Sequence, residues 1–349
     1  MLYILQIEVL NITKRIELKK HKLNIADISI ENAVILAPME GITDLPFRLI
    51  CKELGADIVY SEFIAAEALI RDAERSFAKM KMAEKERPVV IQIFGSKTES
   101  MVEAAKIVEA SGADILDINF GCWVKKVVRN DAGAAFLKQP ERMADLINAI
   151  SNAISIPVTA KTRLGWDRES IVILDVAPML EHAGCKALAV HCRTRDMGMH
   201  GEADWSWGSQ IKSVLKNMPL IINGDIKSAF DAEKAFLETG ADGIMIGRAA
   251  IGNPFLFKQV KEYLNDEIEP GENSFRDSIR ICKKHLDMTI ELKGMPRGMF
   301  EFRKHYSGYL KGLHGASHAR QQLVEIMEYD QIIDTLDRYE NYLAERELS

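Results

Sequence analysis

Short apolar runs rich in β-branched residues recur along the chain at intervals of about 25 to 35 residues. Eight such runs occur, and each is followed by a segment with the apolar periodicity of an amphipathic helix. They lie at 34–39, 58–63, 89–94, 115–120, 157–163, 187–192, 220–224 and 243–247. Strands that alternate with helices form parallel sheets, and eight such units in succession close into a barrel. The sequence therefore predicts an α/β fold with a (β/α)8 TIM barrel.

The chain is longer than a barrel requires. It has 349 residues, whereas a barrel takes roughly 250, which leaves an appendage of about 90. The strand pattern stops after Asn253–Pro254, and an acidic stretch with Pro and Gly at 265–273 precedes long helical patterns. We predict a barrel domain at 25–258 and a C-terminal all-helical domain at 259–349. Residues 1–24, which mix apolar and basic side chains, are assigned to an N-terminal extension.

Composition excludes several classes of protein. The five cysteines lack the paired spacing of metal ligands, and no secretory signal pattern precedes them, so we expect a reduced, cytoplasmic location and no metal. No apolar run reaches the length of a membrane span, so no membrane partner is expected. The net charge of −6 means that any contact with nucleic acid has to come from a local basic patch.

Cys122 follows Gly121 at the end of the fourth predicted strand, and barrel enzymes keep their chemistry at strand ends. A basic cluster comes directly after it, formed by Lys125, Lys126 and Arg129. We interpret Cys122 as a catalytic, proton-donating thiol. The alternative is a cysteine that only packs in a loop, as Cys51, Cys185 and Cys282 are expected to pack within helical segments.

Two neighbouring strand ends carry residues suited to phosphate. Asn223, Gly224 and Asp225 follow the seventh strand, and Gly247 and Arg248 follow the eighth. Glycine lets backbone N–H groups approach phosphate oxygens, and arginine adds a charged donor. The sequence predicts a phosphorylated cofactor here, and the alternative is a pair of ordinary turn glycines.

Three further strand ends are polar or unusual. Lys161 ends the fifth strand, and it would either form a Schiff base or donate to the N1–C2=O edge of a flavin. Gln92, in the third strand, favours the flavin because its amide offers both a donor and an acceptor. His191 ends the sixth strand, and beside a phosphate site we interpret it as a ligand contact rather than a core histidine.

The first strand ends in the turn formed by Pro38, Met39 and Glu40. Proline and the nearby glycine bring this backbone close to whatever occupies the barrel mouth. A methionine at a strand end is suited to packing against a flat ring.

The predicted helical domain begins with a strongly basic part and ends with an acidic one. Its basic residues are interleaved with aromatic ones in the segment that contains Arg303, Lys304, His305, Tyr306, Tyr309 and Lys311. Cations bind phosphates and aromatic rings stack on unpaired bases, so this pattern favours contact with RNA. The alternative is a solvated helix face with mixed charges.

Taken together, six motifs in this order resemble the tRNA-dihydrouridine synthase family. They are the turn after Pro38, Gln92, the 119–122 segment, the 161–163 segment, the 223–225 turn and Gly247–Arg248. The similarity runs from about residue 25 to about residue 313, and the segments at 303–306 and 309–312 resemble the helical domain of the bacterial branch.

The resemblance implies a flavin-dependent oxidoreductase that reduces the C5=C6 bond of specific uridines in tRNA, with FMN as cofactor and NADPH or NADH as reductant. It assigns Cys122 as the proton donor. It places Pro38, Met39 and Glu40 near the isoalloxazine ring, Gln92 and Lys161 at its polar edge, and His191, Asn223, Gly224, Asp225, Gly247 and Arg248 at its outer and phosphate parts. It implies tRNA contacts from Lys125, Lys126, Arg129, Arg303, Lys304 and Lys311.

Two residues depart from the family pattern. The family usually has Pro after the catalytic Cys, where this chain has Trp123, and Gly after the sixth-strand His, where this chain has Cys192. We expect Trp123 to alter the movement of the Cys122 loop or to offer RNA a stacking surface, and Cys192 to be open to oxidation.

Three other functions remain compatible with the residues. The first is another FMN barrel oxidoreductase that acts on a free pyrimidine such as dihydroorotate. The second is a Schiff-base lyase that uses Lys161, and the third is a non-catalytic RNA-binding protein.

Overall fold

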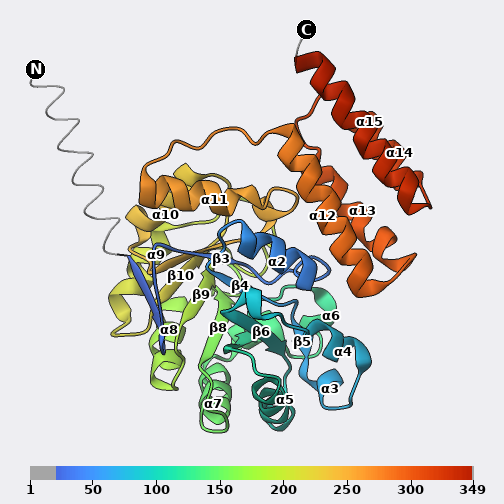
Figure 1. The fold of residues 1–349 in the computed structure, drawn as a ribbon. Helices are drawn as coiled ribbons and strands as arrows, with labels where there is room; N and C mark the ends of the chain where they lie inside the picture. The colour runs from blue at the N-terminus through green and yellow to red at the C-terminus, as the bar shows by residue number, and fades with distance from the viewer. Residues whose placement is uncertain (1–20, 348–349) are drawn as a thin grey trace, which may run out of the picture.

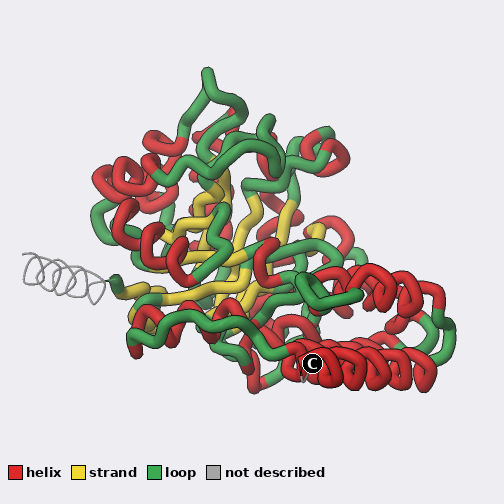
Figure 2. Tube along the Cα trace, turned by 90° about the horizontal axis from the view of Figure 1, so that it is seen from above, coloured by secondary structure: helices red, strands yellow, loops and turns green. Residues whose placement is uncertain are grey.

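The computed structural model of the protein describes residues 21–347. A barrel of strands surrounded by helices makes up most of the molecule, and a group of long helices lies to one side of it (Figure 1). The same arrangement is seen from above in Figure 2, where the strands lie at the centre. The predicted N-terminal extension lies outside the described residues, apart from its last few positions.

The predicted barrel is confirmed. Its eight parallel strands are β3 (Ala33–Leu36), β4 (Ile58–Tyr60), β6 (Val89–Phe94), β7 (Ile115–Asn119), β8 (Val158–Arg163), β9 (Leu188–His191), β10 (Leu220–Asn223) and β11 (Gly243–Ile246). Neighbouring strands pair in parallel around the ring, which closes where β11 pairs with β3 and β4 pairs with β6. All eight carboxyl ends therefore point to one end of the barrel.

The second predicted strand, 58–63, is shorter than expected. β4 ends at Tyr60, and a two-residue strand, β5 (Ile64–Ala65), pairs with β6 farther along. In the gap, the Ser61 hydroxyl accepts a hydrogen bond from the backbone N–H of Gln92 at 3.1 Å. The Ser61 N–H still donates to the Val90 carbonyl at 2.8 Å, and the chain leaves the strand geometry after this residue, at the barrel mouth.

Helices cover the outside of the strands. They are α2 (Leu45–Glu53), α3 (Ala66–Leu69), α4 (Glu74–Lys79), α5 (Thr98–Ala110), α6 (Lys125–Val128), α7 (Pro140–Ser151), α8 (Ile173–His182), α9 (Ser206–Val214), α10 (Ala229–Thr239) and α11 (Phe255–Lys261). Short 3-10 helices are η1 (Glu84–Glu86), η2 (Gly133–Lys138) and η3 (Arg248–Ala250), and η4 (Glu262–Asp266) is a π-helix. Local signals set their ends: Asp44 caps α2 by accepting from the Phe47 N–H, and Ser228 caps α10.

A hairpin closes the amino-terminal end of the barrel. It consists of β1 (Lys22–Ile25) and β2 (Ile28–Glu31), which pair antiparallel. Leu23 and Ile25 are completely buried and pack with inward-facing strand residues such as Ile35 and Ile221. β1 crosses the boundary predicted at residue 24, so the hairpin includes the last residues that we assigned to the extension. Each strand is only four residues long, too short for a clear period of two.

The C-terminal end is all helical, as predicted, with α12 (Phe275–Lys293), α13 (Arg297–Tyr309), α14 (Ala316–Glu325) and α15 (Tyr329–Glu347). α11 packs on the barrel core and continues past the boundary predicted at residue 258, so the helical domain begins only with α12. α12 lies against α2, whose Ile50 belongs to the same apolar cluster as the helical domain. The two domains thus share a core through α2.

The aromatic residues expected to stack on RNA lie inside this core instead. His305, Tyr306 and Tyr309 are each at most 2% exposed and pack around Phe302. Their spacing of three and four residues puts them on one face of α13, the face that the other helices cover. The interleaved pattern was therefore that of a buried helix stripe, and the prediction of exposed stacking rings was wrong.

Within residues 21–347, no helix combines the length and apolar character that crossing a membrane requires.

Candidate functional site

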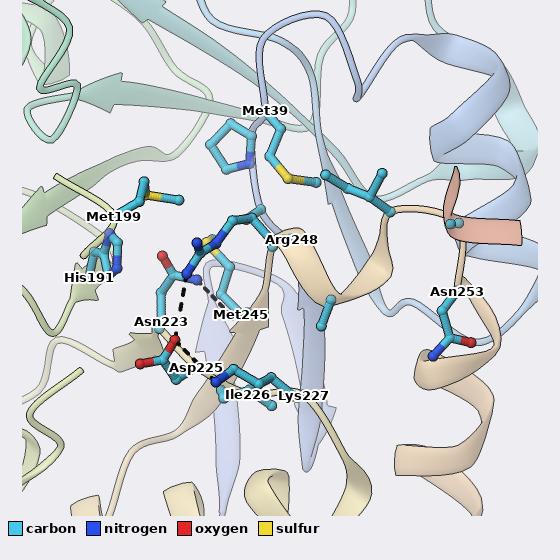
Figure 3. Close-up of a pocket in the computed structure, with 18 of the residues that line it drawn as sticks. Met39, His191, Met199, Asn223, Asp225, Ile226, Lys227, Met245, Arg248 and Asn253 are labelled. Carbon is cyan, nitrogen blue, oxygen red and sulfur yellow. Dashed lines mark hydrogen bonds and ion pairs between the residues drawn. The ribbon is translucent and has the colours of Figure 1, made fainter. Parts of the chain in front are cut away.

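A cavity of about 1050 Å³ opens at the carboxyl ends of the barrel strands and extends toward α13 (Figure 3). Sites for small molecules usually occupy roughly 300–1,000 Å³, so this volume suits a large ligand or two ligands side by side. The predicted residues that line it are Pro38, Met39, Glu40, Cys122, Lys161, His191, Asn223, Gly224, Asp225, Gly247, Arg248 and Lys311. The structure thus brings together residues that the sequence separates by more than two hundred positions.

The barrel interior changes character from one end to the other. Near the hairpin it is apolar, with residues such as Ile35, Val90 and Ile115. Near the cavity the inward-facing positions are polar or charged, and Asp117 and Lys161 are examples. Polar side chains placed in buried strand positions need partners, and they find them in one another.

Gln92 does not reach the cavity directly. It is completely buried, its Nε2 donates to Asp117 Oδ2 at 2.7 Å, and its Oε1 accepts from Asn119 Nδ2 at 2.8 Å. Asn119 lines the cavity, and its Oδ1 accepts from the backbone N–H groups of Gly121 and Cys122 at 3.0 and 2.8 Å. In this structure Gln92 therefore orients Asn119, which in turn holds the Cys122 loop.

Asp117 anchors this chain of hydrogen bonds. Burial raises the pKa of its carboxyl group to about 6, against the opposing effect of hydrogen bonds from Thr159 and Gln92. Thr159 Oγ1 donates to Asp117 Oδ1 at 2.6 Å. The bonds from Thr159 and Gln92 occupy both carboxyl oxygens of Asp117, and the fixed carboxyl group in turn orients the Gln92 amide.

Cys122 lies at the cavity wall with 9% of its surface exposed. Its neighbours include Val127, Ala132 and the ring of Phe63. Burial is the main cause that raises the pKa of the thiol above its usual value, although Arg163 and Lys161 act in the opposite direction. The side chain is therefore a protonated thiol at neutral pH, suited to donating a proton and poorly suited to nucleophilic attack.

Lys161 donates to Asn223 Oδ1 at 3.1 Å, and Asn223 Nδ2 donates to the Met245 carbonyl at 2.8 Å. Burial and the nearby Arg163 lower the pKa of Lys161 to about 8, while Asp117 opposes that shift. The ammonium group still predominates at neutral pH. It presents a directed positive charge in the floor of the cavity.

Arg193 determines which ring nitrogen of His191 carries the proton. The guanidinium of Arg193 lies 3.0 Å from His191 Nε2, and because a guanidinium can only donate, Nε2 has to be the acceptor. Burial, reinforced by Arg163 and other cations, lowers the pKa of His191 well below its usual value. The ring is thus neutral, with its proton on Nδ1 as a donor.

Arg163 joins the loops on two sides of the cavity. Its Nε donates to the Gly121 carbonyl at 2.9 Å, and one terminal nitrogen donates to the carbonyls of Thr194 and Gly198 at 2.9 and 2.8 Å. The Cys122 loop is therefore fastened to the loop after β9.

Sequence reasoning missed Arg163, Arg193 and Asn119 as site residues. A signal was present for two of them, because Arg163 and Arg193 lie two positions after Lys161 and His191, and side chains two apart along a strand face the same way. Asn119 ends β7 and lies three positions before Cys122.

The ends of β10 and β11 gather cations around Asp225. Arg193 donates to its Oδ2 at 2.5 Å, while Arg248 and Lys227 lie 3.6 and 3.8 Å from its Oδ1 (Figure 3). Burial opposes ionisation of Asp225, but the hydrogen bond from Arg193 and the other contacts lower its pKa overall. Arg248 and Lys227 keep much of their charge open to solvent. This group suits a bound phosphate better than an uncharged ligand.

A family model described as "Dihydrouridine synthase (Dus)" matches residues 35–345. The chain belongs to the dihydrouridine synthase family.

Curated relatives agree with this assignment. A protein named tRNA-dihydrouridine synthase B from Pseudomonas syringae pv. tomato is 39% identical, over 85% of this chain and 88% of its own length. Another with that name, from Proteus vulgaris, is 35% identical over 92% of this chain and 99% of its own. A probable tRNA-dihydrouridine synthase 1 from Synechocystis sp. is 35% identical over 90% of this chain and 88% of its own.

Two solved structures share the fold. A 2-naphthoyl-CoA reductase complex has a TM-score of 0.56 at 12% identity and covers 71% of this chain. Histamine dehydrogenase from Rhizobium sp. 4-9 has a TM-score of 0.56 at 13% identity and covers 79% of this chain. This chain spans about half the length of each, and at this identity the likeness shows the fold alone.

The two departures from the family pattern lie in different settings. Trp123 is exposed at the cavity rim. Cys192 is completely buried, and burial raises the pKa of its thiol to about 12. Because oxidation requires an accessible thiolate, the structure contradicts the expectation that Cys192 is open to oxidation. Among residues 21–347, no group of three or more His, Cys, Asp or Glu side chains is arranged to hold a metal ion.

Of the residues expected to contact RNA, one cluster is well placed. Lys125, Lys126 and Arg129 are exposed on and just after α6, close in sequence to Cys122. Within the part of the chain that the structure describes, none of the three has an ion-pair partner. Lys311 lines the outer part of the cavity, on the side of the helical domain.

Arg303 and Lys304 serve the protein's own structure. Arg303 donates to the Ile326 carbonyl at 3.2 Å and lies over the Phe300 ring. Lys304 donates to the Gly41 carbonyl and so joins α13 to the turn after β3. Burial lowers the pKa of Lys304. The structure thus occupies both side chains with internal contacts, where we had expected them to face phosphates.

Most other cations of the helical domain are also paired. Lys283 binds Asp337, Lys284 binds Glu53, and Lys293 binds Asp44 and Glu301. The basic residues that cluster in the sequence of this domain are therefore largely paired with acidic residues in the folded protein. The α6 cluster, close in sequence to Cys122, keeps its positive charge exposed.

Replacing Lys125, Lys126 and Arg129 together with alanine is expected to weaken tRNA binding and to reduce the dependence of log Kd on log salt by up to about 2–3 units of slope, because each phosphate contact contributes roughly 0.7–0.9. Titrations at several salt concentrations measure this. The matched control replaces Lys283 and Lys284, which are ion-paired within the protein, and should leave the slope unchanged. Equal slopes for the wild type and the triple variant would contradict the assignment.

Proposed function

We propose that this protein is a tRNA-dihydrouridine synthase, an oxidoreductase that reduces the C5=C6 bond of uridines in tRNA. The observation that carries the proposal is the Cys122 thiol, which is kept protonated at the wall of a large cavity. That cavity also presents a buried ammonium group and a cation cluster at two neighbouring strand ends. The names of the relatives support the same activity.

The residues present fit FMN. Met39 and Pro38 offer an apolar contact for the ring, and Lys161 offers a positive charge for its electron-rich edge. Arg248 and the glycines at the ends of β10 and β11 suit the phosphate. Gly224 also lies where a side chain does not fit, since a Cβ there would come within 2.8 Å of Ala203 Cβ. Gln92 would act through Asn119 and not by direct contact.

FMN, when bound and reduced by NADPH or NADH, supplies the hydride for uracil C6. Cys122 gives its thiol proton to C5, which completes the reduction and leaves a thiolate to be reprotonated from solvent. Asn119 and Arg163 hold the Cys122 loop so that the thiol faces the cavity. The positive charges of Lys161 and Arg163 lie near enough to Cys122 to stabilise that thiolate.

A uridine stacked in tRNA is out of reach of Cys122. It has to leave its stack, at a cost of a few kcal/mol. Phosphate contacts from Lys125, Lys126 and Arg129 on one side of the cavity and from Lys311 on the other would offset this cost.

The test is the visible absorption spectrum of the purified protein, followed in the same cuvette by anaerobic NADPH and then by unmodified tRNA. We expect flavin bands that bleach with NADPH and return only when tRNA is added. Recovery with a free pyrimidine instead would indicate a small-molecule oxidoreductase. A colourless protein that fails to take up FMN would overturn the flavin assignment, and trapping of a carbonyl substrate on Lys161 by borohydride would then identify a Schiff-base lyase.

A further inference from the structure

Trp123 is a large aromatic residue that the fold leaves exposed. It directly follows Cys122, lines the rim of the cavity and has 40% of its surface exposed. Exposing this much apolar ring to water is unfavourable, and tryptophan at such positions usually contacts a partner.

The indole is held in a fixed place. A Cβ on Gly198 would lie 3.3 Å from Trp123 Cε3, so the ring rests against the Gly198 backbone, which has a φ of +56°. Arg163 donates to the carbonyls of both Gly198 and Gly121. The two loops that carry Trp123 and its support are thus fastened by one buried guanidinium. A rigid ring loses little conformational entropy when it binds.

The surroundings combine apolar and cationic surface. Val124 is also exposed, Met199 lines the cavity beside Gly198, and Lys125 and Lys126 follow at the start of α6. A flat aromatic face beside lysines matches a nucleotide, whose base stacks while its phosphate meets the charge.

The positions of Cys122 and Trp123 indicate whether the target uracil or a neighbouring base would stack on the indole. The target uracil has to reach Cys122, whereas Trp123 lies one residue farther out and is much more exposed. A base that leaves its stack also uncovers one face of its neighbour. We propose that Trp123 is a stacking platform for the nucleobase next to the target uridine, and that it favours RNA sites in which this neighbour is a purine. The inference rests on the proposed function, because it takes the extruded base to be a uridine.

The experiment is a double-mutant cycle that combines substitutions of Trp123 with removal of the base next to the target uridine. RNA stem-loops carry the target uridine beside either adenine or an abasic site, with the change made in turn on the 5′ and the 3′ side. Wild type is compared with Trp123→Ala, Trp123→Leu and Trp123→Phe, and both the Kd and the kcat/KM for dihydrouridine formation are measured. Anaerobic reduction of the flavin by NADPH serves as a readout that involves no RNA.

With adenine at the stacked side, Trp123→Ala and Trp123→Leu are expected to weaken binding about tenfold, equivalent to about 1.4 kcal/mol, and Trp123→Phe much less. With the abasic neighbour all four proteins should bind alike. Equal losses on both RNAs, or a leucine variant that binds like wild type, would overturn the platform. If the wild type formed no dihydrouridine, the proposed function would fail, while the binding cycle would still decide the role of Trp123.

Discussion

Replacing Cys122 with alanine is expected to lower the rate of dihydrouridine formation by about 10²–10⁴-fold, the usual contribution of a positioned general acid. The thiol lies at the cavity wall, burial keeps it protonated, and its loop is held by Asn119 and Arg163. Serine in its place keeps the size but is a far weaker acid, so Cys122→Ser should lose nearly as much. Single-turnover assays that follow the oxidation of reduced flavin on adding tRNA measure the step.

The pH dependence gives a second readout. Only the thiol form of Cys122 can donate, so the rate should fall as pH rises through the pKa of this thiol, which burial raises above its usual value. The Lys161 ammonium group, whose pKa burial lowers to about 8, loses its charge at lower pH and gives a separate, earlier decrease. The matched control is Cys185→Ala, since Cys185 is also buried but lies away from the cavity among the barrel helices. A Cys122→Ala variant that forms dihydrouridine at the wild-type rate would refute the assignment.

The barrel was predictable because its signal is repeated. Each strand, such as β6 or β8, combines a short apolar run with a following amphipathic segment, and eight repetitions outweigh errors at single boundaries. The same repetition placed the candidate residues, since every strand end meets at one end of the barrel. Lys161, His191 and Asn223 could therefore be grouped before any contact was known.

Features that depend on which other segment of the chain covers a side chain could not be predicted from the sequence. The helical pattern of His305, Tyr306 and Tyr309 is the same for a buried and an exposed face, and only the docking of the other helices decides between them. Lys304 binds a carbonyl more than 250 positions away in the sequence. Gln92 was expected at the cavity, but Asn119 stands between them. Contacts between distant segments have no local signature in the chain.

The interface between the domains depends on α2, and α2 depends on one buried ion pair. Arg48 Nε donates to Glu86 Oε2 at 2.7 Å, and a terminal nitrogen donates to Oε1 at 3.1 Å. Both side chains are at most 1% exposed. Arg48 also donates to the carbonyls of Thr43 and Lys81 at 3.0 and 2.7 Å. The pair thus ties α2 to the turn that carries Met39 on one side and to the segment before β6 on the other.

Replacing Arg48 with methionine is expected to lower the free energy of unfolding by about 3–5 kcal/mol, because it leaves the Glu86 carboxylate buried without its cation. The free energy of unfolding of a typical domain is only about 5–15 kcal/mol, so this loss is a large fraction of it. Urea unfolding measures it as a fall in the midpoint at a constant slope. We also expect weaker retention of FMN, since the Thr43 carbonyl loses its donor and the turn with Met39 loosens.

Two controls separate the buried charge from lost packing. In the double variant Arg48→Met with Glu86→Gln, the neutral amide can still accept from the Ala83 N–H, which donates to Glu86 Oε1 at 2.9 Å in the wild type. Removing the unpaired charge should restore much of the lost stability. Lys106→Met breaks the exposed pair with Glu103 and should cost about 1 kcal/mol or less. A double variant as unstable as Arg48→Met would show that packing, and not charge, holds α2 between the two domains.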